Sequence, residues 1–280
     1  MSHISFSELK EWTTCPWKHK LNYIDKINEF KGNEHTAFGT ALHSVCETIV
    51  KEHVNNQQNT NLEAQFEQEF LGNLRKIKED KPDITFNSGL VVSMREQGKH
   101  LTKFILPATK KYFGNFKLIA IEEKLYEPIQ DQNEDITDQG KNSENQVENF
   151  KGFIDLVVYV PKDNKYHIID WKTCSWGWDS RKKTDKMITY QLTLYKHFWC
   201  KKHNKDYNDV TTHFALLKRT ARKNQVEIFK VSNGTKKINN ALKLLDKSIY
   251  NIKKKNYVKN RLSCYGKYGM CEYYKSEHCT

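Results

Sequence analysis

The chain has 280 residues, of which 38% are hydrophobic and 29% charged, and its formal net charge is +12. This composition excludes a disordered chain, and no apolar run approaches the ~20 residues that a membrane-spanning helix needs. The first residues, MSHISFSELKEW, lack the basic-then-apolar plan of a secretory signal. We therefore expect a cytoplasmic protein of a bacterium or of a phage-infected cell, where disulfides are unusual.

Apolar periodicity predicts both helices and strands along the chain. The predicted helical segments are 4–30, which includes a turn and a Ser5 or Ser7 cap, 38–54, 60–112 apart from a loop at 81–89, 186–203 and 235–255. The predicted strands are 117–129, 152–160, 165–173, 211–219 and 226–231. Residues 131–146 are polar and predict a flexible loop.

These elements predict an α/β fold with a central mixed sheet flanked by helices. We expect residues 1–280 to form a single domain. Within it, residues 55–112 would be a helical insertion or lid, and residues 260–280 a Cys-rich tail that packs with the N-terminal helix.

Lysine and arginine occur in bursts at 181–183, 201–205, 218–223 and 253–259. A basic surface attracts polyanions, nucleic acid first among them. The alternative is a set of ordinary solvated helix faces, and charge alone does not decide between the two.

The hairpin of residues 152–172 is the most informative segment. If its turn at 161–164 is tight, residue 160 faces 165, and five steps back along each strand Asp155 lies opposite Asp170. Like charges directly opposite each other on a sheet are destabilising, and a divalent cation is the simplest compensation. Carboxylate oxygens suit Mg²⁺ or Mn²⁺.

Lys172 follows Asp170 at the spacing that places both side chains on one face of the strand, while Ile169 and Trp171 point into a core. Two acids that hold a metal, with a lysine beside them, can hydrolyse a phosphodiester bond. The metal would activate water, and the lysine would act as an electrostatic or general-base partner. The alternative is a surface ion-pair patch.

The segments GFIDLVV, IIDWKT and the helix carrying Gln191 and Tyr195 resemble the RecB-like nucleases of the PD-(D/E)XK superfamily. This group includes CRISPR-adaptation nucleases and phage exonucleases. The resemblance covers most of the chain and is weakest over 55–112 and 131–149. It implies a restriction-endonuclease-like core.

The resemblance also implies site residues. Asp155 matches the acid of a G-x-x-D motif, and Asp170 and Lys172 match D-x-K. His43 ends a helical G-x-x-x-H element that begins at Gly39. The implied metal ligands are His43, Asp155, Asp170 and the backbone carbonyl of Trp171.

Three further residues follow from the resemblance. Glu122 resembles an additional metal-binding acid, with the adjacent Glu123 as the alternative. Gln191 and Tyr195 match a Q-x-x-x-Y element that places substrate beside the site. These two residues are one helical turn apart, and the tyrosine could stack on a base or reach a phosphate. Without the resemblance, the pair would be an ordinary half-buried helix face.

Four cysteines suggest a second metal centre. They are Cys15, Cys264, Cys271 and Cys279. Four thiolates suit a [4Fe–4S] cluster or tetrahedral zinc, and uncoordinated thiols are the third alternative. One N-terminal and three C-terminal cysteines resemble the iron–sulfur staple of some family members, which favours the cluster. Core positions are predicted for Cys46, Cys174 and Cys200.

The sequence therefore predicts a divalent-metal-dependent deoxyribonuclease. An exonuclease that acts on single-stranded or end-containing DNA in recombination, repair or phage DNA processing fits best. The alternatives are a non-catalytic nucleic-acid-binding module with a structural metal site, and an interaction protein whose cysteine site is architectural. The chain has no P-loop motif, so unwinding would need a helicase or recombination partner.

Overall fold

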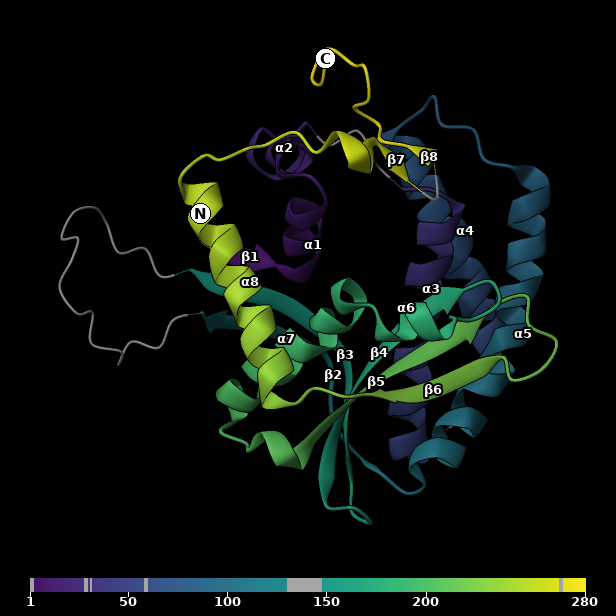
Figure 1. Cartoon of the computed structure of the whole chain (residues 1–280). Helices are drawn as coiled ribbons and strands as arrows, with labels where there is room; N and C mark the ends of the chain where they lie inside the picture. Colours follow the sequence, from purple (N-terminus) through teal and green to yellow (C-terminus); the bar gives the residue numbers. More distant parts are fainter. Residues whose placement is uncertain (1–2, 28–29, 31, 58–59, 130–147, 267–268) are drawn as a thin grey trace. The chain divides into compact units, whose positions relative to one another are not determined.

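The computed structural model shows helices and strands in two units, each with its own internal contacts (Figure 1). The structure describes residues 3–27, 30, 32–57, 60–129, 148–266 and 269–280, so the predicted loop at 131–146 lies outside it. Unit 1 comprises Met1–Glu29, Lys124–Gly152 and Gly234–Thr280, and unit 2 comprises Phe30–Glu123 and Phe153–Asn233. The assignment of residues 1–280 to one nuclease domain stays a prediction.

The elements of unit 2 confirm the predicted helices and strands with two differences. The helix that ends at Phe113 begins at Ser88, inside the predicted loop 81–89, and the short helix at Ser180–Thr184 was not predicted. The helices of unit 2 are α3 (Glu34–Val54), α4 (Leu62–Asp80), α5 (Ser88–Phe113), α6 (Ser180–Thr184) and α7 (Lys186–His203). Its strands are β4 (Lys165–Cys174), β5 (Val210–Lys218) and β6 (Val226–Val231), with parts of β2 (Lys117–Pro128) and β3 (Asn149–Val160).

The sheet is mixed, as predicted. β3 pairs with β4 antiparallel, β4 with β5 parallel, and β5 with β6 antiparallel. The β3–β4 register runs from Val160 opposite Lys165 to Leu156 opposite Ile169, which is the predicted register. The pairing stops one step before Asp155 and Asp170 meet. Asp155 instead accepts a hydrogen bond from the backbone N–H of Trp171 at 2.7 Å.

One face of this sheet packs against α3, α4 and α5. Leu156, Val158, Ile169 and Trp171 share a buried apolar cluster with side chains of all three helices, including the predicted α3 stripe. Burying these side chains supplies the main free energy that holds the helices on the sheet. Within the predicted insertion 55–112, α4 and α5 are thus helices packed on α3, while the role of the insertion as a lid stays a prediction.

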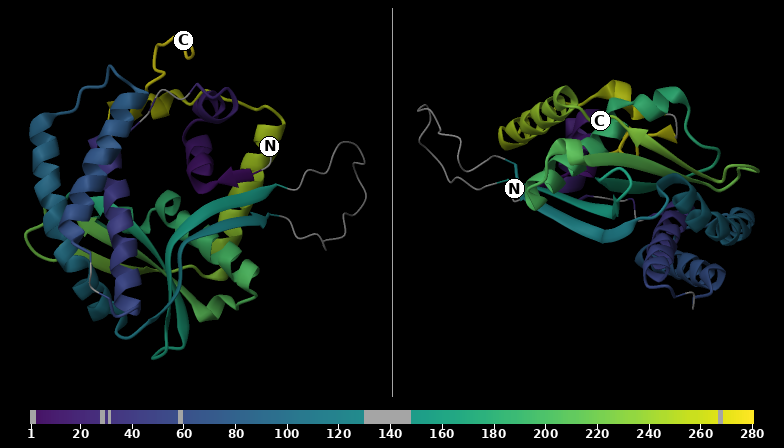
Figure 2. Two further views of the ribbon diagram at one scale, coloured as in Figure 1. Left: turned by 180° about the vertical axis from the view of Figure 1, so that it is seen from behind. Right: turned by 90° about the horizontal axis from the view of Figure 1, so that it is seen from below.

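The opposite face carries α6 and α7. Tyr166 of β4 contacts Trp199 of α7 with ring centroids 5.3 Å apart. Lys183 of α6 forms an ion pair with Glu227 of β6 at 2.5 Å. Figure 2 shows α3–α5 and α6 on opposite sides of strands β4–β6. Asp170 and Lys172 alternate with the residues of the α3 face, so they belong to the α6–α7 face.

Unit 1 joins the two ends of the chain. Its elements are β1 (His3–Ser5), α1 (Phe6–Thr14), α2 (Pro16–His19), a π-helix (Lys20–Ile24), α8 (Thr235–Lys253), a 3₁₀-helix (Arg261–Cys264), β7 (Tyr265–Gly266) and β8 (Gly269–Met270). Ser5 caps α1, as predicted, by accepting a hydrogen bond from the Glu8 N–H. The π-helix was not predicted.

The C-terminal tail contacts the N-terminal segment at several points within unit 1. Trp17 donates its indole N–H to the carbonyl of His278 at 2.9 Å, and Lys18 forms an ion pair with Glu272 at 2.8 Å. These contacts hold residues from opposite ends of the sequence together. None of the helices formed by the described residues is long and apolar enough to cross a membrane.

Two buried histidines lie between the sheet and α5. His167 Nδ1 and His213 Nε2 are 3.0 Å apart, and the hydroxyl of Tyr112 is 3.3 Å from His213 Nδ1. Asp163 lies 3.2 Å from the other ring nitrogen of His167. Burial, together with the neighbouring His167 and Lys230, lowers the pKa of His213 to about 3.

This arrangement predicts acid sensitivity. Below pH ~6.5 the unfolded chain takes up a proton at His213 while the folded chain does not, so the free energy of unfolding falls as the pH drops. Between pH 7 and pH 5 this residue should account for up to about 2 kcal/mol of the loss. His213→Gln should make the pH dependence shallower in urea unfolding measured at several pH values. His100→Gln, at an exposed histidine, is the control. If the free energy of unfolding of His213→Gln depended on pH as steeply as that of the unsubstituted protein, this account would be wrong.

Candidate functional site

Strands β3 and β4 deliver two carboxylates and a lysine to one place. Asp170 is 2% exposed, and its Oδ2 lies 2.6 Å from the ammonium of Lys172. That buried oxygen makes no hydrogen bond of ordinary geometry within the described residues. Asp155, held by the Trp171 N–H, is close enough to Asp170 for each charge to affect the other. These residues were predicted together, and the structure brings them together.

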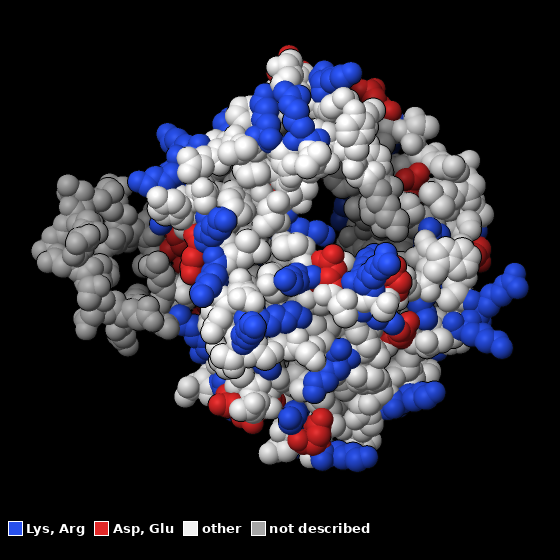
Figure 3. Space-filling model, in the orientation of Figure 1, with Lys and Arg blue, Asp and Glu red and all other residues white. Residues whose placement is uncertain are grey.

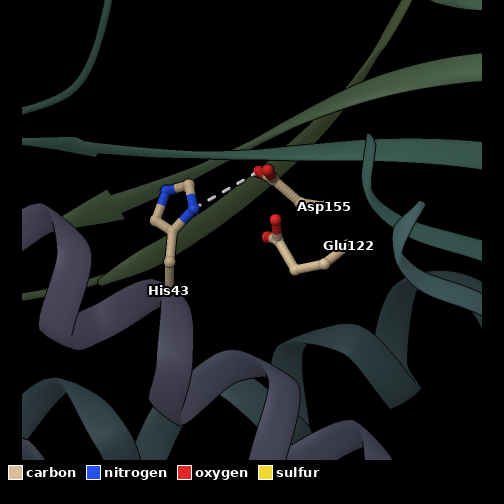
Figure 4. Close-up of side chains that lie close together, drawn as sticks. All are labelled: His43, Glu122 and Asp155. Atoms are coloured by element: carbon tan, nitrogen blue, oxygen red, sulfur yellow. Dashed lines mark ion pairs between the residues drawn. The ribbon is translucent and has the colours of Figure 1, made fainter. Parts of the chain in front are cut away.

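Helix α3 and strand β2 add two more donors. His43 Nδ1 lies 3.6 Å from Asp155 Oδ2. Ligand atoms of His43, Glu122 and Asp155 all lie within 4.8 Å of one another. Figure 4 shows the Glu122 carboxylate and the His43 ring both directed toward Asp155. Of the described residues, this trio is the set of histidine, cysteine and acidic side chains spaced to hold a metal ion.

The backbone of β2 explains why Glu122 reaches the site. Glu122 has a positive φ of 49°, which is uncommon for a residue other than glycine. This left-handed conformation interrupts the alternation of the strand. Strained backbone of this kind, worth about 1–3 kcal/mol, is concentrated at functional sites.

Glu123, the alternative to Glu122, is engaged elsewhere. Its carboxylate accepts the indole N–H of Trp199 at 2.8 Å and pairs with Lys202 at 2.7 Å and His203 at 2.6 Å. These partners all lie on α7. The geometry therefore favours Glu122 as the acid beside His43 and Asp155.

Burial and like charge shape the protonation of the site. Burial raises the pKa of Asp155 well above its ordinary value, and Asp170 raises it further. Burial also lowers the pKa of His43, which favours the neutral imidazole that a metal binds. Burial alone would lower the pKa of Lys172, but Asp170 and Asp155 raise it above its ordinary value.

The residues present fit a divalent cation. Carboxylates from β2, β3 and β4 and the His43 ring provide hard oxygen donors and one nitrogen, a set suited to Mn²⁺ and, through its oxygens, to Mg²⁺. The buried Asp170 Oδ2, which forms an ion pair with Lys172, is a further oxygen donor at this place. The peptide of Trp171 faces the same place, since its N–H binds Asp155 and its backbone also hydrogen-bonds His43.

Glu47, one helical turn after His43 on α3, lies near the site and was not predicted there. Its charge, after burial, raises the pKa of Glu122, and its carboxylate pairs with Lys51 at 3.1 Å. The available signal was its spacing of four residues from His43, which places both on one side of the helix.

The burial of Tyr195 bears on which of its two predicted contacts, with a base or with a phosphate, is the more favourable. Gln191 donates a side-chain N–H to the Tyr195 hydroxyl at 3.2 Å, so the two share a helix face as predicted. However, the Tyr195 residue is only 6% exposed, which leaves no ring face for a base to stack on. The hydroxyl lies near the acids, because Asp170 contributes to the raised pKa of Tyr195 after burial. Its expected contact with substrate is therefore a polar one.

The four tail and N-terminal cysteines are all in unit 1, and every cysteine of the chain is free. The Cys271 N–H donates to the carbonyl of Cys264 at 2.9 Å. The sulfur of Cys15 accepts the N–H of Asn260 at 3.4 Å. Cys279 directly follows His278, whose carbonyl binds Trp17. Of the cysteines predicted for the core, Cys46 and Cys200 are buried and Cys174 is half-buried.

The chain is similar to a known protein family in sequence and to a solved structure in fold. A family model described as "PD-(D/E)XK nuclease superfamily" matches residues 3–275. The chain is also similar to a crystal structure described as a "Putative exonuclease" from Eubacterium rectale. That match has a TM-score of 0.54 and 14% identity, and covers 92% of this chain and 83% of the other. At this identity the likeness shows the fold. No curated protein matches in sequence.

The charge cluster predicts how stability responds to metal. Without metal, Asp155→Asn should raise the free energy of unfolding by about 1 kcal/mol, or roughly 2–4 °C in melting temperature, because it removes one of several neighbouring negative charges. Added Mn²⁺ should raise the melting temperature of the unsubstituted protein and not that of the variant. Asp83→Asn, at an exposed acid between α4 and α5, is the control. An equal Mn²⁺ response in Asp155→Asn would rule out Asp155 as a ligand.

Proposed function

The chain belongs to the PD-(D/E)XK nuclease superfamily, and on that premise we propose that it hydrolyses DNA phosphodiester bonds with the help of a divalent cation. One observation supports this most directly. His43, Glu122 and Asp155 have ligand atoms within 4.8 Å of one another, beside the Asp170–Lys172 ion pair. A purely structural role would not require this concentration of acids.

His43, Asp155, Asp170, the Trp171 carbonyl and Glu122 would hold the ion. Bound Mg²⁺ or Mn²⁺ would supply Lewis-acid activation of the attacking water and of the phosphoryl oxygen. Neutral His43 presents a lone pair to this position. The Trp171 N–H orients Asp155 by holding its Oδ2 at 2.7 Å.

Lys172 and the pair on α7 would act on the substrate. Lys172 is held as a cation by Asp170, 2.6 Å away, and so would stabilise charge that develops on the phosphate. A general-base role would first require its release from Asp170. Gln191 and the Tyr195 hydroxyl would orient the phosphate by hydrogen bonding.

The charge of the protein fits a nucleic-acid substrate. Lys and Arg total 46 against 34 Asp and Glu, and blue side chains are spread over the face shown in Figure 3. Phosphate contacts by such residues give affinity without sequence preference.

An exonuclease acting on single-stranded or end-containing DNA is the preferred form of this activity. The similarity to the structure described as a "Putative exonuclease" supports it. Recombination, repair or phage DNA processing inside the cell is the proposed setting. A helicase partner would supply any unwinding, since the chain lacks a P-loop motif.

Asp170→Asn should reduce cleavage by about 10²-fold or more, because it removes a carboxylate that would hold both the metal and Lys172. The assay uses Mn²⁺ with end-labelled linear and circular single strands, and melting curves verify folding. Asp83→Asn should cleave like the unsubstituted protein. Full activity in a folded Asp170→Asn protein would overturn the mechanism and favour a non-catalytic binding module.

The same assay tests the preference for ends. An exonuclease degrades the linear strand and leaves the circle intact. Equal cleavage of the linear and circular strands would show an endonuclease. That result would not contradict the proposed metal site.

For the cysteines we propose a structural [4Fe–4S] cluster held by Cys15, Cys264, Cys271 and Cys279. All four are free and lie in unit 1, where the tail already contacts the N-terminal segment. Ligands from both chain ends would close a long loop, and metal binding would add to folding stability.

Protein purified without oxygen should then be brown, with broad visible absorbance. Cys279→Ala should bleach it and lower its melting temperature. Cys174→Ala, at a half-buried cysteine of unit 2, should keep the colour. Colourless protein without bound zinc that tolerates Cys15→Ala and Cys279→Ala together would show uncoordinated thiols.

A further inference from the structure

The loop between β4 and α6 presents an exposed tryptophan directly after the strand that carries Asp170 and Lys172. Trp176 is 77% exposed, and its ring makes no hydrogen bond or ring contact with the part of the chain that the structure describes. Trp176 follows Lys172 by four residues, so their Cα atoms are at most about 14 Å apart. That distance corresponds to roughly four stacked nucleotides at ~3.4 Å each.

The loop is held firmly by its neighbours. The carbonyl of Ser175 accepts hydrogen bonds from the N–H and hydroxyl of Thr220, at 3.1 and 2.8 Å. Arg219 donates its N–H to the carbonyl of Cys174 at 2.9 Å and a guanidinium N–H to the Ser175 hydroxyl at 3.1 Å. An aromatic side chain on such a fixed loop loses little conformational freedom when it binds.

Gly177 lies between an exposed tryptophan, Trp176, and a tryptophan that packs on the sheet, Trp178. It has a φ of +122°, and a Cβ at this position would lie 3.1 Å from Lys218 Cδ. After this turn, Trp178 packs on Phe214 of β5 with ring centroids 5.1 Å apart. Trp178 therefore anchors the loop and Trp176 does not.

The contact between Trp178 and Phe214 also shows which face of the sheet the loop covers. Phe214 is the register partner of Asp170, so the two side chains lie on one face. Because Trp178 contacts Phe214, the loop folds over the face that carries Asp170 and Lys172. The loop thus lies on the catalytic side of unit 2.

Two cations beside the loop lack acidic partners within the described ranges. Lys182 lies over the Trp178 ring at 4.8 Å and forms no ion pair. Arg219 binds only the neutral side chains of Gln97 and Ser175, at 2.9 and 3.1 Å. Positive charge beside an exposed aromatic ring is the combination that binds single-stranded nucleic acid, phosphate by phosphate and base by base.

We propose that Trp176 stacks on a nucleobase of the substrate strand while Arg219 and Lys182 bind its phosphates, a placement that rests on the proposed nuclease function. Tyr195, the other aromatic residue considered for stacking, is only 6% exposed. Trp176 would hold the strand a few nucleotides from the scissile bond. It would be a positioning residue that contributes to affinity and not to the chemical step.

The test is binding of an oligodeoxythymidine of about 12 nucleotides, and of an abasic strand of equal length, in EDTA at low salt. Trp176→Ala should weaken binding of the first strand by about 5- to 150-fold and leave binding of the abasic strand unchanged. Trp176→Phe should restore most of the affinity. Tyr250→Ala, which removes a 62% exposed ring from α8, is the matched control. Melting curves of the Trp176 variants should match the unsubstituted protein.

Several results would overturn the inference: no binding of the thymidine strand by the unsubstituted protein, equal affinity in Trp176→Ala, or an equal loss for the abasic strand. In Mn²⁺, saturating substrate should restore the single-turnover rate of Trp176→Ala. Cleavage by the unsubstituted protein with unchanged binding in Trp176→Ala would overturn the stacking role and keep the nuclease. Base-dependent binding without cleavage would overturn the nuclease and keep the stacking role.

Discussion

Buried negative charge at the end of the β3–β4 hairpin is the constraint on which the site depends. Asp170 is almost fully buried, and Asp155 lies close enough for burial and the charge of Asp170 to raise its pKa well above the ordinary value. Without compensation this arrangement costs stability, because each carboxylate loses solvation and repels the other. Lys172 offsets part of that cost through its ion pair with Asp170. The Trp171 N–H offsets another part by binding Asp155. A divalent cation would offset the rest, and metal binding would then be coupled to folding.

The remaining donors come from elements that the hairpin itself does not position. The buried apolar stripe of α3 packs on the hydrophobic face of β3 and β4, and this packing brings His43 to the edge of the acid pair. β2 contributes Glu122 only because its backbone turns into the left-handed region at that residue. Such a backbone conformation persists only where the surrounding structure offsets its cost. A change in the packing of α3 would be expected to disturb the site through His43, even though no ligand was altered.

The parts of the site that are local in sequence could be predicted, and the parts that depend on packing could not. The hairpin register followed from the turn at 161–164 and from strand alternation, and the structure has it. The choice between Glu122 and Glu123 could not be made from the sequence. It depends on the positive φ of Glu122 and on the hydrogen bond that the Trp199 N–H donates to Glu123. The choice between a base and a phosphate as the contact of Tyr195 also depends on packing, because Tyr195 is only 6% exposed. A spacing of four residues shows that two side chains share a helix face, but not whether that face is covered.

The two candidate metal centres lie in different units, but the chain connects them. Glu122 is next to the last residue of one stretch of unit 2, and Asp155 is near the first residue of the other. The strands that carry them, β2 and β3, both continue into unit 1. Asp170 and Lys172 lie on β4, which is entirely within unit 2. Loosening of unit 1, for instance by loss of a cysteine centre, would therefore reach Glu122 and Asp155 along their own strands before it reached Asp170. A cysteine centre in unit 1 can in this way support metal binding in unit 2 without contributing a ligand to it.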